Sequence, residues 1–134
     1  GHGTQRPLGI LIATIHDWGM KRVWVVRLGY QAEQDYVEIL QWTTKTFGES
    51  QASTYAETMA LAIAALEDGP DVLGARARDD IQPGIRTLHV ARLGRAGRHF
   101  VVFRVTGAAI DVLRLLHDSM DLPRHLPTAN DRAS

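Results

Sequence analysis

Two helical patterns, separated by a very short corner, constrain the fold of this 134-residue chain more than any other feature. In residues 31–47 and again in 52–66, apolar groups recur at spacings of three and four, as they do on one face of a helix. Gly48 is expected to end the first helix in a left-handed conformation, and Ser50 is expected to cap the second. Because the connection is so short, the two helices should pack as an antiparallel hairpin.

Four strand patterns surround this hairpin. One covers residues 21–28, and three follow the helices at 85–93, 99–105 and 109–117. A last short helix is expected at 122–126. This order predicts an α+β fold, β-α-α-β-β-β, in which the helical hairpin packs on one face of a mostly antiparallel sheet.

The last two strands carry apolar side chains on both faces, given that side chains alternate along a strand. In 99–105, one face holds Val101, Phe103 and Val105, and the other holds Phe100, Val102 and Arg104. In 109–117, strict alternation places one set on one face and a second set on the other. The first set is Leu113, Leu115 and His117, and the second is Ile110, Val112, Arg114 and Leu116. The hairpin can cover only one face, so the second is expected to meet a partner or to lie exposed.

Residues 20–127 are expected to form a single domain, because the length suits one domain and Met20 opens the first strand pattern. Residues 1–19 are expected to be an N-terminal extension or a cloning remnant, and 128–134 a flexible tail. The longest apolar run, at 8–15, is too short to cross a bilayer, so no membrane segment is expected. The absence of cysteine excludes a disulfide scaffold and a cysteine nucleophile, and it suits a cytoplasmic location.

Charge is balanced overall but unevenly placed along the chain. The formal net charge is zero, yet 33–71 holds eight acidic residues and one lysine, whereas 76–104 holds seven arginines and two aspartates. Arginine favours planar, two-point partners such as carboxylates and phosphates. The basic half is therefore the part of the chain where acidic partners are expected.

The sequence offers little for catalysis. It has no glycine-rich phosphate loop, no cluster with metal-ligand spacing and no nucleophile elbow, so no metal, cofactor or catalytic residue is expected. The main alternative is an RNA-cleaving site in which His89, His99, Arg86, Arg104 and Arg114 converge on the sheet. Against it stand structural interpretations: His89 would face solvent, and Arg104 and Arg114 would pair with Asp111 or a helix acid. Phe47, Tyr55 and Met59 are expected in the core.

Four short motifs, taken in order, resemble the ParE toxins of the RelE/ParE superfamily. They are FGESQASTY at 47–55, DDIQPGIRTL at 79–88, FVVFRV at 100–105 and IDVLRLLHDSMDLPRHL at 110–126. The resemblance covers the chain from Met20 to about Leu126. It departs from the family pattern at the longer turn LGRAG, 93–97, and at Phe103, where tyrosine is common.

The resemblance implies a RelE/ParE-like fold and a role as the toxin of a type II toxin–antitoxin system. Such a toxin would inhibit DNA gyrase and block replication without being an enzyme, and a cognate ParD-like antitoxin would wrap along its helices and sheet as a hetero-oligomer. No membrane and no sequence-specific nucleic acid would be bound. A ribosome-dependent mRNA endoribonuclease of RelE type and a non-toxic interaction module remain as alternatives.

The residues expected to bind the antitoxin or the target lie in the basic half and the tail. They are Arg86, Phe100, Val102, Arg104, Arg114, His117 and Asp121. Arg104 and Arg114 each interrupt an apolar strand, so each is expected to reach an antitoxin carboxylate or an acid of this chain. His117 and Asp121 are expected to join Arg114 in a polar network that holds the tail.

Overall fold

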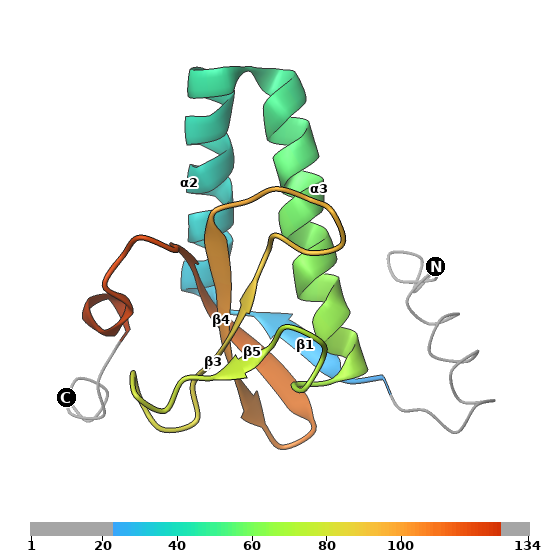
Figure 1. Ribbon diagram of the computed structural model, residues 1–134, viewed down its shortest axis with the longest axis vertical. Helices are drawn as coiled ribbons and strands as arrows, with labels where there is room; N and C mark the ends of the chain where they lie inside the picture. The colour runs from blue at the N-terminus through green and yellow to red at the C-terminus, as the bar shows by residue number, and fades with distance from the viewer. Residues whose placement is uncertain (1–22, 127–134) are drawn as a thin grey trace.

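The structure, a computed structural model, describes residues 23–126 and contains a helical hairpin packed on a five-stranded sheet (Figure 1). Its elements are β1 (Val25–Leu28), α2 (Tyr30–Phe47), α3 (Glu49–Ala65), the 3-10 turn η1 (Leu66–Asp68), β2 (Arg76–Ala77), β3 (Arg86–His89), β4 (His99–Thr106), β5 (Ala109–His117) and the 3-10 turn η2 (Leu122–His125). The strand order is β1-β5-β4-β3-β2. Only β1 and β5 pair in parallel, so the predicted α+β, mostly antiparallel fold is confirmed.

The element order also matches the prediction, with β2 as an additional two-residue strand beside β3. The expected strand at 85–93 is shorter, and the expected last helix is the turn η2. The interpretations of residues 1–19 and 128–134 lie outside the described residues. Within residues 23–126, no helix is both long enough and apolar enough to span a bilayer.

The hairpin turns at Gly48, whose φ of 98° is in the left-handed region that favours glycine. Its N–H donates to the carbonyl of Thr44, and α3 begins at the next residue, Glu49. Ser50 therefore lies within the first turn of α3, and the expectation that it caps this helix is wrong. Across the hairpin, the Tyr36 hydroxyl donates to the carbonyl of Ala56 over 3.1 Å.

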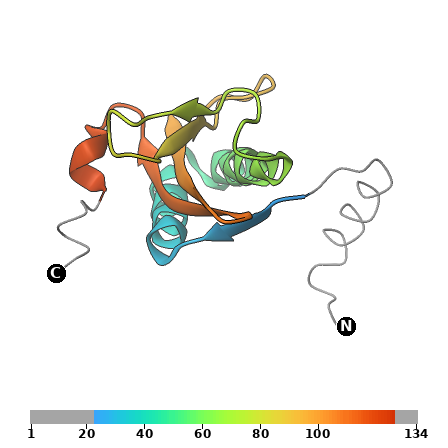
Figure 2. The same cartoon turned by 90° about the horizontal axis from the view of Figure 1, so that it is seen from below.

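Both helices lie on one face of the sheet, which curves around them when the molecule is seen from below (Figure 2). The buried core between the two layers combines small helix residues with strand residues. Its buried members are Ala32, Met59, Ala62, Leu66, Leu88, Val90, Val101, Phe103, Ile110, Val112 and Leu115. Met59 and Ala32 are fully buried, so side chains of α3 and α2 both contribute to this core.

A β-bulge changes which side chains of β5 face the helices. Val102 pairs with Arg114, whereas the next residue, Phe103, pairs with Val112, so Leu113 is an extra residue in β5. Strict alternation in this strand was therefore a wrong expectation, because a bulge shifts every following residue relative to the preceding ones. As a result Leu115 joins the helix-side core, and Leu113 packs in a separate cluster.

The second face of the sheet is covered by the chain itself. Val102 and Leu116 pack against the loop before β3 and against η2, in a cluster of Ile85, Val102, Leu116, Leu122 and Leu126 with Ile81, Phe100 and Leu113 around it. The expectation that this face meets a partner or lies exposed is wrong, since two segments distant in sequence fold over it. Because both faces of the sheet are covered, the candidate functional site lies at the ends of the strands.

Candidate functional site

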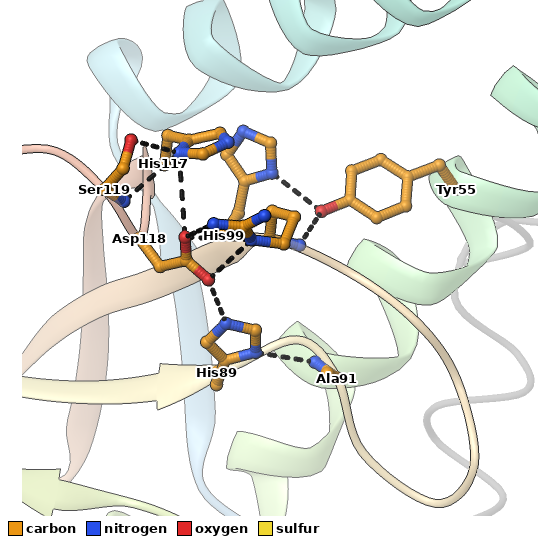
Figure 3. A network of polar contacts seen from close by, with 8 residues as sticks. Tyr55, His89, Ala91, His99, His117, Asp118 and Ser119 are labelled. Atoms are coloured by element: carbon orange, nitrogen blue, oxygen red, sulfur yellow. Dashed lines mark hydrogen bonds and ion pairs between the residues drawn. The ribbon is translucent and has the colours of Figure 1, made fainter. Parts of the chain in front are cut away.

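Three histidines gather where β3 and β5 end and β4 begins (Figure 3). His89 is the last residue of β3, His99 the first of β4 and His117 the last of β5. Antiparallel pairing places His99 opposite His117, with ring centroids 5.2 Å apart. We refer to these residues, with Tyr55, Arg98 and Asp118, as the histidine cluster.

Asp118 lies at the centre of this cluster. One carboxylate oxygen accepts from His89 Nε2 over 2.9 Å, and the other accepts from Arg98 Nη2 over 3.0 Å. The N–H of Ala91 donates to His89 Nδ1, which leaves the ring proton of a neutral His89 on Nε2, facing Asp118. The hydrogen bonds from Arg98 and His89 lower the pKa of Asp118 to about 2, so this group is a stable anion.

His99 and Tyr55 form the second half of the cluster. The Tyr55 hydroxyl lies 2.7 Å from His99 Nδ1, and it accepts the backbone N–H of Arg98 over 3.0 Å. Burial, followed by the charge of His117, lowers the pKa of His99 to about 4, and burial raises the pKa of Tyr55. Both groups are therefore neutral near pH 7, and the Tyr55 hydroxyl can donate a hydrogen bond to His99 Nδ1.

His117 faces the turn that follows β5. Its Nδ1 lies 2.7 Å from Ser119 Oγ and accepts the Ser119 backbone N–H over 3.1 Å. Each ring of the cluster thus has a partner nearby in the fold. The expected solvent-facing position of His89 is wrong, because its Nε2 is held by Asp118.

An open groove of about 780 Å³ runs beside the histidine cluster, between the helical hairpin and the loop before β4. Its apolar wall includes Ile39, Trp42, Phe47 and Met120, and Tyr55, His99 and His117 also line it. We refer to it as the hairpin groove.

Two aromatic rings dominate the wall of the hairpin groove. Trp42 is 60% exposed and Phe47 59% exposed, with their rings edge to face at 5.7 Å. Contiguous exposed apolar side chains of this kind mark interaction surfaces. The expectation that Phe47 lies in the core is wrong, whereas Met59 is confirmed there.

The residues predicted to bind a partner are scattered by the fold. Arg86 donates to the carbonyl of Pro70 and pairs with Asp71 over 2.9 Å. Phe100 and Val102 belong to the closed second face, and Val102 is fully buried. A partner could therefore reach Val102 only if η2 moved away.

Arg114 is held inside the fold by Asp35 of α2, at 2.8 Å from Nε and 3.0 Å from Nη2. Asp35 also accepts the backbone N–H of Leu115 beside the bulge, over 2.9 Å, and Arg114 Nη1 donates to the carbonyl of His125. The prediction that Arg114 reaches an acid is confirmed in its intramolecular form. One buried carboxylate thus serves both the guanidinium and a strand N–H.

Arg104 has a different environment. It lies opposite Asp111 in the β4–β5 register, but both oxygens of Asp111 are bonded by Arg27, at 2.7 and 3.1 Å. Hydrogen bonding by Arg27, with a smaller contribution from the charge of Arg104, lowers the pKa of Asp111. Within residues 23–126, Arg104 forms no salt bridge, so the expected ion pair with Asp111 is not made although Asp111 lies opposite it in the register.

The predicted network of Arg114, His117 and Asp121 is wrong. Arg114 bonds to α2 and η2, His117 bonds to Ser119, and Asp121 approaches Arg124 at 3.9 Å. The bulge accounts for this, because it breaks the two-residue alternation between Arg114 and the end of β5.

The RNA-cleaving set is also only partly assembled. His89 and His99 lie close enough to interact (Figure 3), but Arg86, Arg104 and Arg114 lie at other places in the fold. Sequence reasoning missed Arg98 and Asp118, although each is the chain neighbour of a histidine at a strand end. Within residues 23–126, no group of three or more histidine or carboxylate side chains could hold a metal ion.

Comparison with known proteins gives consistent matches over this region. A family model described as the ParE toxin of the type II toxin–antitoxin system, parDE, matches residues 26–122. Toxin ParE1 of Mycobacterium tuberculosis is 38% identical over 96 residues, which cover 71% of this chain and 90% of the relative. Toxin ParE1 of Caulobacter vibrioides is 27% identical over 100 residues, covering 75% and 95%.

A solved structure shares the fold. The chromosomal ParDE toxin–antitoxin system from P. aeruginosa contains a chain that superposes with a TM-score of 0.58 at 22% identity. The superposition covers 71% of this chain and 96% of that one. The region matched by the family model, residues 26–122, runs from β1 into the start of η2 and includes the hairpin groove and the histidine cluster.

Proposed function

This chain belongs to the ParE toxin family of type II toxin–antitoxin systems, and we propose that it inhibits DNA gyrase until a cognate ParD-like antitoxin binds it. In this proposal the toxin acts in the cytoplasm, blocks replication and arrests growth by binding rather than by catalysis. The support is the family itself, since ParE-like proteins are associated with gyrase, together with two features of the surface.

The hairpin groove supports binding of an antitoxin. Three large apolar side chains that line this groove, Trp42, Phe47 and Met120, are 43–60% exposed. Covering such side chains removes apolar surface from water, which drives association. An antitoxin segment that wraps along the helices and the sheet, as expected for this family, would place its own apolar side chains here.

The bonding of the histidine cluster supports a binding role over RNA cleavage. A nuclease needs a base that titrates near neutral pH and a cation free to meet the phosphate. Here Arg98 and His89 are bonded to Asp118, and the pKa of His99 lies far below neutrality. These groups stabilise the loop before β4 and the turn after β5.

The convergence of three histidines beside an open groove favours one second candidate, a ribosome-dependent endoribonuclease. In that case His117, whose other ring nitrogen faces away from Ser119, would have to act on RNA together with a cation from the ribosome. The two candidates make opposite predictions about translation. They can therefore be separated by the order of events in cells.

Supercoiling by purified gyrase, with and without this protein, tests the proposal directly. We expect loss of supercoiling and accumulation of cleaved DNA, with activity restored when the cognate antitoxin is added. In cells, a DNA-damage response and filamentation should precede any fall in translation. Normal supercoiling at a molar excess of toxin, with rapid mRNA cleavage in cells, would transfer the assignment to the endoribonuclease.

A further inference from the structure

A second cavity, of about 490 Å³, lies away from the hairpin groove, where the start of α2 meets β4, β5 and η2. Leu113 is partly exposed in it, Ile85 and Leu126 form its buried floor, and Arg104 also lines it. We refer to it as the Arg104 pocket. Its volume is in the range of ordinary ligand pockets, about 300–1,000 Å³.

Arg104 is the feature that distinguishes this pocket. Its side chain is only partly exposed and forms no salt bridge within residues 23–126, whereas Arg114 beside it is bonded to Asp35. The nearest strand partner, Asp111, is already held at two points by Arg27. A guanidinium in an apolar setting gains most from a two-point contact with a carboxylate, and no carboxylate among residues 23–126 makes such a contact with Arg104.

The charge of the lining is also one-sided. Among residues 23–126, two arginines line the pocket and no carboxylate does, and Asp35 pairs with Arg114. The start of α2 contributes Gly29, Tyr30 and Gln31 to the same wall, and no side chain of the described residues caps this helix. Its first N–H groups have no acceptor within the helix, which adds to the attraction for an anion placed near Arg104.

We propose that the Arg104 pocket binds a carboxylate attached to an apolar group, supplied by an acidic side chain of the antitoxin. The carboxylate meets the guanidinium of Arg104, and the adjoining apolar group packs on Leu113, above the buried Ile85 and Leu126. The identity of the donor rests on the proposed function; the chemistry of the pocket does not.

One chain could reach both sites along α2. Gln31 lines the Arg104 pocket and Ile39 lines the hairpin groove, eight positions further along the same helix. At 1.5 Å per residue this is a distance of about 12 Å along the axis, which about four extended residues span. An antitoxin segment can therefore place apolar side chains in the groove and an acidic one on Arg104.

Two small probes of the same shape test the chemistry on the free toxin. The acid 4-methylpentanoate and the neutral 4-methylpentanamide are titrated into labelled protein to about 50 mM while NMR follows Arg104 Nε–H, the Gln31 amide and the Leu113 methyls. We expect saturable shifts with the acid and binding at least about tenfold weaker with the amide. Equal binding of both probes, or no shift with the acid, overturns the proposal.

Matched variants identify the cation. Arg104→Gln should weaken binding of the acid at least about tenfold, and Arg104→Lys, which keeps the charge but loses the fork, should give an intermediate value. Arg76→Gln is the control, because Arg76 is exposed and forms no salt bridge in the described chain. Unchanged binding in a folded Arg104→Gln protein overturns the assignment to Arg104.

The cognate antitoxin then tests the occupant. Arg104→Gln should lower antitoxin affinity at least about tenfold, and Arg76→Gln should leave it unchanged. Binding of the acid probe with no loss of antitoxin affinity overturns the assignment of the pocket to the antitoxin. Neither result depends on gyrase, so failure of the supercoiling test would refute the proposed target and leave the pocket standing.

Discussion

At the scale of single residues, two arginine–aspartate pairs offer a matched comparison of burial. Arg114 and Asp35 have side chains 22% and 9% exposed, whereas Arg27 and Asp111 are 55% and 27% exposed, and both pairs are joined at two points. Water screens the second pair, and the first leaves little water near either group. The same chemistry should therefore differ in its contribution to folding.

We expect Arg114→Ala to lower the free energy of unfolding by about 2–4 kcal/mol, because Asp35 would remain buried without its cation. Arg27→Ala should cost clearly less, because water screens its exposed ion pair. Denaturant unfolding of the free toxin measures both. Similar losses for the two variants would show that Asp35 keeps its hydration in the fold.

The histidine cluster predicts a stability that depends on pH. The pKa of His99 is about 4 in the fold, against about 6.5 in an unfolded chain, so between these values only the unfolded state takes up the proton. The contribution of His99 to the free energy of unfolding should therefore be fully present above pH 6.5 and be lost as the pH drops towards 4. The loss should be roughly 1–2 kcal/mol once the solvent-exposed part of the ring is allowed for.

His99→Gln should remove this slope, as measured by unfolding at a series of pH values. A further loss should appear in both proteins below about pH 4, where Asp118, with its pKa of about 2 in the fold, begins to bind protons only when unfolded. A wild-type slope that persists in His99→Gln would place the responsible group elsewhere.

At the scale of elements, the corner of the hairpin depends on Gly48, which ends α2, and not on Ser50, which was expected to cap α3. Gly48 has a φ of 98°, and a side chain there is strained although nothing lies within 4 Å of the added carbon. Gly48→Ala should cost about 1–2 kcal/mol in unfolding free energy. Ser50→Ala should cost less than about 0.5 kcal/mol, because Ser50 is not the cap. A loss of about 1 kcal/mol would show that Ser50 caps α3 after all.

Elements set by local pattern could be predicted from the sequence, and contacts between distant segments could not. The spacing of three and four in α2 and α3 follows from helix geometry, so both helices and their antiparallel packing were predicted. The bulge at Leu113 depends on the register between β4 and β5, and the covering of Val102 depends on η2. Periodicity within one strand contains neither kind of information.

The same division applies to the candidate site. Arg104 and Arg114 were identified because each interrupts an apolar strand, and this signal is local. Asp118 was missed because its bond partners His89 and Arg98 are 29 and 20 positions away. The exposed wall of the hairpin groove was missed because Phe47 fits the helical stripe, and only its place at the open end of the hairpin leaves it in water.

At the scale of the whole molecule, residues 23–126 of the free toxin form two buried cores, and the hairpin groove is an exposed apolar wall beside them. The chain covers both faces of its sheet, and the paired rings of Trp42 and Phe47 leave exposed apolar surface together in the hairpin groove. A residue of this wall should matter little to folding and much to binding, which is the opposite of what holds for Arg114.

We therefore expect Trp42→Ala to change the unfolding free energy of the free toxin by less than about 1 kcal/mol, since the side chain is 60% exposed. Antitoxin affinity should fall by about 2 kcal/mol or more, as for a buried aromatic at the centre of an interface. Leu61→Ala is the control, because Leu61 is 48% exposed on α3 and does not line the groove. Binding isotherms and thermal melts on both variants separate the two roles.

If Trp42→Ala binds the antitoxin as tightly as the wild type, the antitoxin does not use the hairpin groove. The supercoiling assay on Trp42→Ala would then test whether the exposed aromatic pair serves the proposed inhibition of gyrase instead.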